Sequence, residues 1–138
     1  MPTSAELLLD TSAALAILRD ANPAHETAFE LTQGTLLGLA GHALYETFSV
    51  LTRLPGANRF SARYAAHVIA QEFPASVALP PSIALNAVST LSEAGIAGGA
   101  VYDGLVGLAA KAAGITLLSC DRRAAPIYAA LGVDVRLI

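Results

Sequence analysis

The last third of the chain decides the fold and reads GGAVYDGLVGLAAKAAGITLLSCDRRAAPIYAALGVDVRLI (residues 98–138). Two helix-length segments rich in alanine alternate there with two short, mostly aliphatic runs, and a glycine follows each helical segment. This pattern predicts helices over 98–113 and 122–131 and strands over 115–119 and 133–138. Strands that alternate with helices of about ten or more residues are typical of a parallel sheet with helices on both faces.

The first two thirds of the chain continue the same alternation. Helices are expected where an apolar segment lies between a capping residue and a following glycine or proline. The expected helices are 12–19, with Thr11 or Ser12 as its N-cap, 23–33, 42–54, 61–73 and 82–94, and the expected strands are 6–9, 35–40 and a brief edge strand at 77–79. We therefore predict an α/β fold, with one domain over residues 1–138 built as a three-layer α/β/α sandwich around a central, mainly parallel sheet.

Composition sets the broad class of the protein. The chain has 138 residues, of which 54% are hydrophobic and 14% charged, which suffices for one compact core and excludes a disordered chain. No uninterrupted run of about 20 apolar residues occurs, so no membrane-spanning helix is expected despite a mean hydropathy of +0.56. The first residues do not resemble a signal peptide, so a cytoplasmic protein is expected. The single cysteine predicts that there is no internal disulfide and no cysteine-based zinc site.

The charge balance leaves the class of partner open. A net charge of −3 and a pI near 5.5 are not typical of a nucleic-acid-binding protein. Only one of the eight basic residues is a lysine, Lys111, and arginines gather at 53–63 and 122–123. Arginine binds phosphate through a planar fork of N–H donors. The excess of arginine over lysine indicates either phosphate binding or the codon preference of a GC-rich genome.

Two aspartates follow predicted strands that lie far apart in the sequence. Asp10 ends the first strand, and Asp121 comes two residues after the strand over 115–119. Ligands of open α/β sheets bind outside the carboxyl ends of the strands, so both carboxylates are expected at one edge of the sheet. Each aspartate alone is also explained as a helix cap or a turn residue.

Two further acids lie on helices. Asp103 is near the start of a helix that is apolar on most faces, where a carboxylate has to be paired, hydrogen-bonded or bound to a metal. Complementing the helix dipole is its alternative role. Glu46 stands at the border of the apolar stripe of the helix over 42–54, close to Arg53 on the helical wheel, and an ordinary surface glutamate facing an arginine is its alternative role.

Other catalytic chemistries find no support in the sequence. No histidine has a recognisable place beside Cys120, and the three histidines lack the spacing of a zinc site. Neither a phosphate-binding Gly-x-x-x-x-Gly-Lys loop nor a dinucleotide-binding Gly-x-Gly-x-x-Gly turn occurs. The remaining acids lie at element ends or on helix positions that can face water and are given no chemistry: Glu6, Asp20, Glu26, Glu30, Glu72, Glu93 and Asp134.

The segments that carry the four acids resemble, in order and in context, the motifs of the PIN domain family of nucleases. They are LLLDTS (7–12), ALYETFSVLTR (43–53), VYDGLVGLA (101–109) and LLSCD (117–121). In the family, an aspartate followed by threonine or serine ends the first strand, the second and third acids lie on helices, and a late strand delivers the fourth. Glycines at 104 and 107 replace the usual small alanines, and close packing is expected there. The length is similar to that of VapC-type toxins of toxin–antitoxin pairs.

The resemblance implies a function and a set of site residues. It implies a Mg²⁺- or Mn²⁺-dependent ribonuclease that forms a homodimer and is inhibited by an antitoxin, with Asp10, Glu46, Asp103 and Asp121 as its catalytic acids. Asp10 and Asp103 are expected to bind the metal directly and Asp121 directly or through water, while Glu46 orients a water or helps to hold a second ion. The residues expected to orient these acids are Thr11, Ser12 and Ser119, and those expected to contact RNA phosphates are Arg122 first, then Arg53 and Arg59.

Three alternatives to a toxin stay open: a PIN-domain RNA-processing nuclease, a non-catalytic PIN-like binding module and a receiver-like signalling domain. The receiver needs a second acid beside Asp10 and a lysine at the end of a late strand, whereas Thr11 follows Asp10 and Lys111 lies within a predicted helix. For the toxin, an antitoxin segment is expected in a groove between the helices over 12–19 and 42–54, where its arginine would displace the metal from the carboxylates.

Overall fold

A four-stranded parallel sheet forms the centre of the molecule in the computed structural model, which describes residues 4–138. The strands are β1 (Leu7–Leu9), β2 (Leu37–Leu39), β3 (Leu117–Ser119) and β4 (Val135–Leu137). Their spatial order is β2-β1-β3-β4, and each neighbouring pair is parallel. The parallel sheet expected from the alternating pattern is therefore confirmed.

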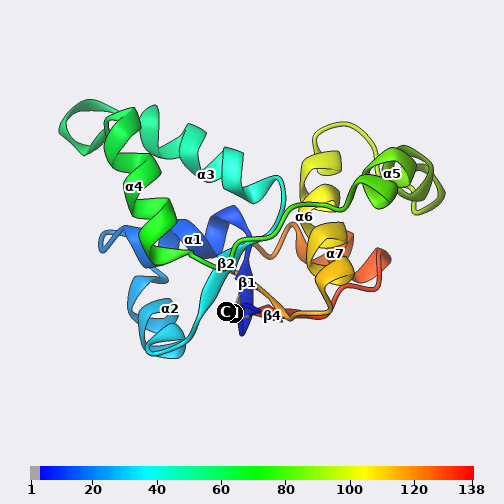
Figure 1. The fold of residues 1–138 in the computed structure, drawn as a ribbon, viewed down its shortest axis with the longest axis horizontal. Helices are drawn as coiled ribbons and strands as arrows, with labels where there is room; N and C mark the ends of the chain where they lie inside the picture. The colour runs from blue at the N-terminus through cyan, green and yellow to red at the C-terminus, as the bar shows by residue number, and fades with distance from the viewer. Residues whose placement is uncertain (1–3) are drawn as a thin grey trace.

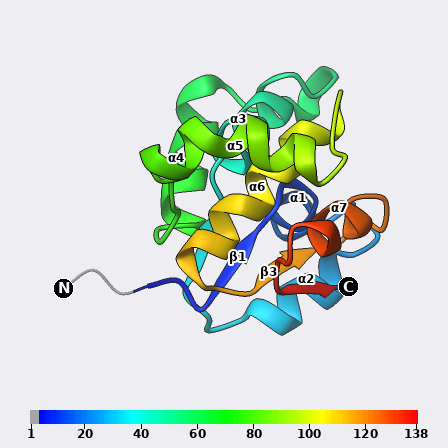
Figure 2. The ribbon, with the colours of Figure 1, turned by 90° about the vertical axis from the view of Figure 1, so that its right-hand side faces the viewer.

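Helices cover both faces of this sheet. The helices α1 (Thr11–Leu18), α2 (His25–Thr32), α3 (Ala43–Thr52) and α4 (Ala62–Glu72) lie on the left of the strands in Figure 1. The helices α5 (Pro81–Glu93), α6 (Ala100–Ala113) and α7 (Ala125–Ala130) lie on the right and face the viewer in Figure 2. A short 3₁₀ helix, Gly56–Asn58, links α3 to α4. This is the α/β/α arrangement predicted from the sequence.

The two central strands carry the core. Leu8, Leu9, Leu117 and Leu118 are each 0% exposed, because helices cover both faces of β1 and β3. Burying one leucine side chain contributes roughly 1.5–3 kcal/mol. The core therefore fixes the ends of β1 and β3, from which Asp10 and Asp121 follow.

The edge strand predicted at 77–79 does not form. Only one parallel bridge forms there, between Ala40 and Val77. The amide of Leu39 donates to the hydroxyl of Ser76 at 2.9 Å, so a side chain takes the place of a backbone partner at this point. The chains approach closely beside it, and a Cβ added to Gly38 would lie 2.2 Å from the carbonyl oxygen of Ala75.

The helices begin one to three residues away from their predicted starts. Asp10, rather than Thr11 or Ser12, is the N-cap of α1, because its carboxylate accepts the amide of Ala13 at 3.0 Å. The second helix begins at His25 rather than at residue 23. The helix after β3 begins at Ala125 rather than at residue 122, because residues 122–124 form a turn. Among residues 4–138, no helix is long and apolar enough to cross a membrane.

Candidate active site

The strand order brings the ends of β1 and β3 together. β1 lies between β2 and β3. The chain adds β2 on one side of β1 and then returns to add β3 on the other side, so the strand order reverses at β1. Open α/β sheets bind ligands at such a switch point, outside the carboxyl ends of the strands. Asp10 directly follows β1, and Asp121 follows β3 by two residues.

A pocket of about 290 Å³ lies at this edge and contains all four acids predicted from the sequence. Residues from α1, α3, α6 and the β3–α7 turn line it: Asp10, Thr11, Ser12, Leu15, Glu46, Val50, Arg53, Asp103, Val106 and Asp121. The structure thus brings together side chains that lie more than a hundred positions apart in the sequence.

Asp10 is held by three hydrogen bonds. Its Oδ1 accepts the hydroxyl of Ser12 at 2.6 Å and the amide of Ala13 at 3.0 Å. Its Oδ2 accepts the hydroxyl of Tyr128 at 2.8 Å. Asp10 is only 4% exposed and Tyr128 is fully buried, so neither side chain can rely on bulk water for these bonds. The carboxylate is therefore fixed in place.

Tyr128 was not among the residues expected from the sequence. Its signal there is weak: it is the only aromatic residue in the alanine-rich α7. A buried tyrosine usually finds a partner for its hydroxyl, but the sequence does not say which one. The partner, Asp10, is 118 positions away.

Two serines join the end of β3 to the start of α1. The hydroxyl of Ser12, besides donating to Asp10, accepts the amide of Cys120 at 2.9 Å. The hydroxyl of Ser119 accepts the amide of Asp121 at 3.1 Å. These bonds set the direction in which the chain leaves β3, and so the place of Asp121.

Glu46 reaches the pocket from α3. The hydroxyl of Thr11 donates to its Oε1 at 2.5 Å, which ties α3 to the start of α1. Arg53, the residue directly after α3, lies about two helical turns beyond Glu46 and lines the same pocket. The residue that follows Asp10 therefore orients the second acid, while Ser12 contacts Asp10 itself.

Asp103 lies close to the other three carboxylates of the pocket. Burial raises its pKa, and the negative charges of Glu46, Asp121 and Asp10 raise it further. The guanidinium of Arg123 acts in the opposite direction, but it is almost fully exposed and lies 3.6 Å from Asp121. Negative charge in the pocket is thus only partly compensated by the protein's own cations.

The donor set fits a hard divalent cation. Every charged acceptor in the pocket is a carboxylate, and Mg²⁺ and Mn²⁺ prefer oxygen ligands. Within the described residues 4–138, no three His, Cys, Asp or Glu side chains are arranged to enclose a metal ion as they stand. Mg²⁺ in proteins typically binds one or two carboxylates directly and keeps several waters.

The comparison with known families decides the classification. The PIN domain model matches residues 7–129, which run from the first residue of β1 into α7 and contain the whole pocket. The chain belongs to the PIN domain family. Ribonuclease VapC27 of Mycobacterium tuberculosis (strain ATCC 25618 / H37Rv) is 38% identical to this PIN domain over 129 residues, covering 94% of each chain. Ribonuclease VapC40 of Mycobacterium tuberculosis (strain CDC 1551 / Oshkosh) is 40% identical over 136 residues, covering 94% of this chain and 96% of the relative.

Solved structures share the fold of this PIN domain. FitAB bound to an IR36 DNA fragment matches with a TM-score of 0.72 and 18% identity, over 95% of this chain and 94% of the other. VapBC2 from Rickettsia felis, bound to a DNA fragment from its promoter, matches with a TM-score of 0.68 and 11% identity, over 96% and 98% of the chains. At this identity the likeness concerns the fold alone.

The three arginines that were predicted to contact RNA phosphates lie at different positions relative to the acidic pocket of the PIN domain. Arg53 lines the pocket. Arg122 is exposed beside Asp121 but does not line the pocket, and the Nε of Arg59 donates to the carbonyl of Leu54 at 2.8 Å. Arg123, for which the sequence suggested no role, has its backbone amide and its guanidinium directed at the Asp121 carboxylate.

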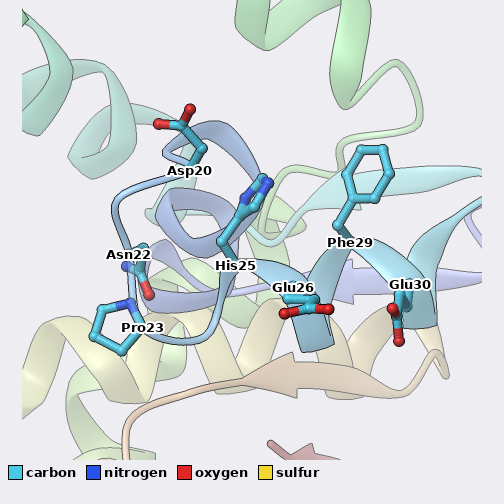
Figure 3. Close-up of a pocket in the computed structure, with 7 residues that line it drawn as sticks. All are labelled: Asp20, Asn22, Pro23, His25, Glu26, Phe29 and Glu30. Carbon is cyan, nitrogen blue, oxygen red and sulfur yellow. The ribbon is translucent and has the colours of Figure 1, made fainter.

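A second acidic pocket of the PIN domain, about 400 Å³ in volume, lies at the α1–α2 turn and has a different character. Its three carboxylates belong to Asp20, Glu26 and Glu30. Figure 3 shows Asp20 on the far side of the His25 ring from both glutamates, so the three acids do not converge. The Nδ1 of His25 is hydrogen-bonded to the carbonyl of Ala16 at 2.8 Å.

Cys120 does not supply a nucleophile to the PIN domain. It is half-buried beside the acidic pocket. Burial, and then the charge of Asp10, raise the pKa of its thiol to about 11, so the thiol stays protonated at neutral pH. This agrees with the sequence, which places no recognisable histidine beside Cys120.

Proposed function

We propose that this PIN domain is a metal-dependent ribonuclease that cleaves RNA phosphodiester bonds as the toxin of a toxin–antitoxin pair in the cytoplasm. The observation that carries the proposal is the convergence of Asp10, Glu46, Asp103 and Asp121 on one open pocket. Two relatives of nearly full length, at 38% and 40% identity, bear the name ribonuclease and support the reaction class.

In this proposal Asp10 and Asp103 bind Mg²⁺ or Mn²⁺ directly, and Asp121 binds directly or through water. Such an ion supplies activation of water and neutralisation of charge on the phosphate. Glu46 orients the attacking water. Because Thr11 donates to Oε1 of Glu46, we assign that task to Oε2. The role of Ser12 and Ser119 is to keep Asp10 and Asp121 in position.

Arginines in and near the pocket would give the RNA backbone a path to the four acids. Arg53 lies inside the pocket and is assigned to the phosphate at the cleavage site. Arg122 is exposed next to Asp121 and is assigned to a phosphate beyond it. Arg59 contributes less, because its Nε is already bonded to Leu54. Contacts of this kind give affinity without base specificity.

The partner we propose is an antitoxin that closes the pocket. Similar structures include FitAB and VapBC2, each in complex with DNA. The pocket lies between α1 and α3, and Leu15 and Val50 give it apolar walls next to the carboxylates. An apolar segment with one arginine would fit both features, and its guanidinium would take the place of the metal.

The assembly we propose is a homodimer. Leu85 and Val88 are 86% and 80% exposed on α5, one helical turn apart. Contiguous exposed apolar surface often marks a protein–protein contact. A two-fold contact through α5 would cover them.

The test is RNA cleavage with and without metal. The natural protein is expected to cleave RNA with Mg²⁺ or Mn²⁺ and to lose this activity in EDTA, and Asp103→Asn is expected to be inactive in both conditions. Glu93→Gln, a charge-neutralising change at an exposed site on α5, serves as the matched control and is expected to stay active. Cleavage that persists in EDTA would contradict the metal site, and absence of cleavage by the natural protein in every metal would indicate a binding module.

A further inference from the structure

The hydrogen bond between Tyr128 and Asp10 links the last helix to the first strand. Tyr128 is 0% exposed, and its hydroxyl donates to Oδ2 of Asp10 at 2.8 Å. The proposed reaction assigns no step to Tyr128. Its bond is nevertheless made to a carboxylate that lines the acidic pocket.

The position of the Tyr128 ring is set by packing rather than by this bond alone. A Cβ added to Gly107 would lie 3.1 Å from Cδ1 of Tyr128, so the ring lies against a helix position that has no side chain. The Nζ of Lys111 donates to the carbonyl of Leu131 at 2.8 Å and holds the end of α7 against α6. The hydroxyl is thus brought to Asp10 by a rigid support.

The hydrogen bonds on Asp10 restrict how it can bind a metal. An ionised carboxylate has about four lone-pair positions, two on each oxygen. Ser12 and Ala13 occupy both positions on Oδ1. Tyr128 occupies one position on Oδ2. One position, on Oδ2, is left.

We propose that Tyr128 is a positioning residue that makes Asp10 a one-oxygen metal ligand through Oδ2. The inference rests on the proposed metal-dependent function. Without the Tyr128 hydroxyl, the carboxylate keeps its two bonds on Oδ1 but can rotate about them and present Oδ2 in other directions. Partners behind a metal ligand of this kind typically change metal affinity by about 10- to 100-fold.

The experiment measures Mn²⁺ binding to the intact protein without RNA, by the loss of the free-ion signal in electron paramagnetic resonance. Tyr128→Phe removes one oxygen and keeps the ring that fills the core. It is expected to raise the Kd for Mn²⁺ about 10- to 100-fold. Tyr64→Phe, which removes the same atom from an exposed tyrosine on α4, is the matched control and is expected to leave the Kd unchanged.

A second control separates positioning from a loss of stability. Ile127→Ala shortens a partly buried side chain on the same helix and is expected to lower the melting temperature without changing the Kd for Mn²⁺. An unchanged Kd in Tyr128→Phe, with normal binding by the natural protein, would overturn the role of Tyr128 and leave the metal site standing. An equal loss of affinity in Ile127→Ala would reduce that role to general stability. Absence of Mn²⁺ binding by the natural protein would overturn the metal site and the inference together.

Discussion

Replacing Asp103 by asparagine is expected to stabilise the metal-free protein while it removes activity. The substitution keeps the shape of the side chain and deletes a charge that burial and three neighbouring carboxylates oppose. Because Asp103 is half-exposed, water screens this repulsion, and the gain is about 1 kcal/mol rather than several. For a domain of this length, that corresponds to a rise in the melting temperature of roughly 3–5 °C.

The pH dependence of unfolding provides a second test of whether Asp103→Asn stabilises the metal-free protein. The folded-state pKa of Asp103 lies above its ordinary value of 3.8. An acid of this kind costs no stability below its ordinary pKa, where it is protonated in both states. The cost grows as the pH rises from the ordinary to the raised pKa and is complete above the raised one. The advantage of Asp103→Asn is therefore expected at neutral pH and should vanish as the pH falls through the raised pKa toward 3.8.

With Mn²⁺ bound, the natural protein should become more stable than the Asp103→Asn variant. With Mn²⁺ at 100 times its Kd, the natural protein gains about 2.7 kcal/mol, whereas the variant gains little. The assay is thermal unfolding of both proteins in EDTA and in Mn²⁺, at low salt, with Glu93→Gln as the control for loss of a charge away from the pocket. A variant that is less stable than the natural protein in EDTA at neutral pH would refute the repulsion argument.

The packing of Gly38, the two arginines and the exposed face of α5 can each be tested by substitution. Gly38→Ala should cost about 3 kcal/mol in urea unfolding, because its Cβ would meet the backbone of Ala75, whereas Gly99→Ala, which meets nothing within 4 Å, should cost little. Arg53→Ala and Arg122→Ala should each weaken RNA binding equally across sequences and reduce the salt slope by about 1, with Arg136→Ala on β4 as control, and a changed sequence preference would contradict the phosphate assignment. Leu85→Glu, on the exposed face of α5, should yield a monomer in light scattering, and an unchanged particle mass would place the dimer contact elsewhere.

The sequence was informative where one short pattern determines the structure. The aliphatic runs before Asp10 and Asp121 predict buried parallel strands, and the rule for carboxyl strand ends predicts that these acids meet. Asp103 stood out as a carboxylate on a helix that is apolar on most faces, where it needs a partner or a metal. Glu46 was different. Its helix pattern does not separate it from an ordinary surface glutamate, so its place in the pocket depended on the family resemblance.

The features that sequence patterns missed depend on packing between distant elements. No local signal pairs Tyr128 with Asp10, because the bond requires α7 to pack against α6 and β3 to lie beside β1. The choice between Arg122 and Arg123 depends on the turn after β3, where Asp121 accepts the amide of Arg123 and directs that side chain back toward itself. A turn of this kind shifts the expected helix start by three residues, to Ala125.

The metal site among the four acids can be tested by diffraction from a crystal soaked in Mn²⁺, recorded at a wavelength where manganese scatters anomalously. One strong anomalous peak is expected in the acidic pocket, within roughly 2.5 Å of Oδ2 of Asp10 and of a carboxylate oxygen of Asp103. The same peak should be absent from crystals of Asp103→Asn. A peak at the second pocket, beside Asp20 or Glu26, with none among the four acids, would contradict the assignment of the site.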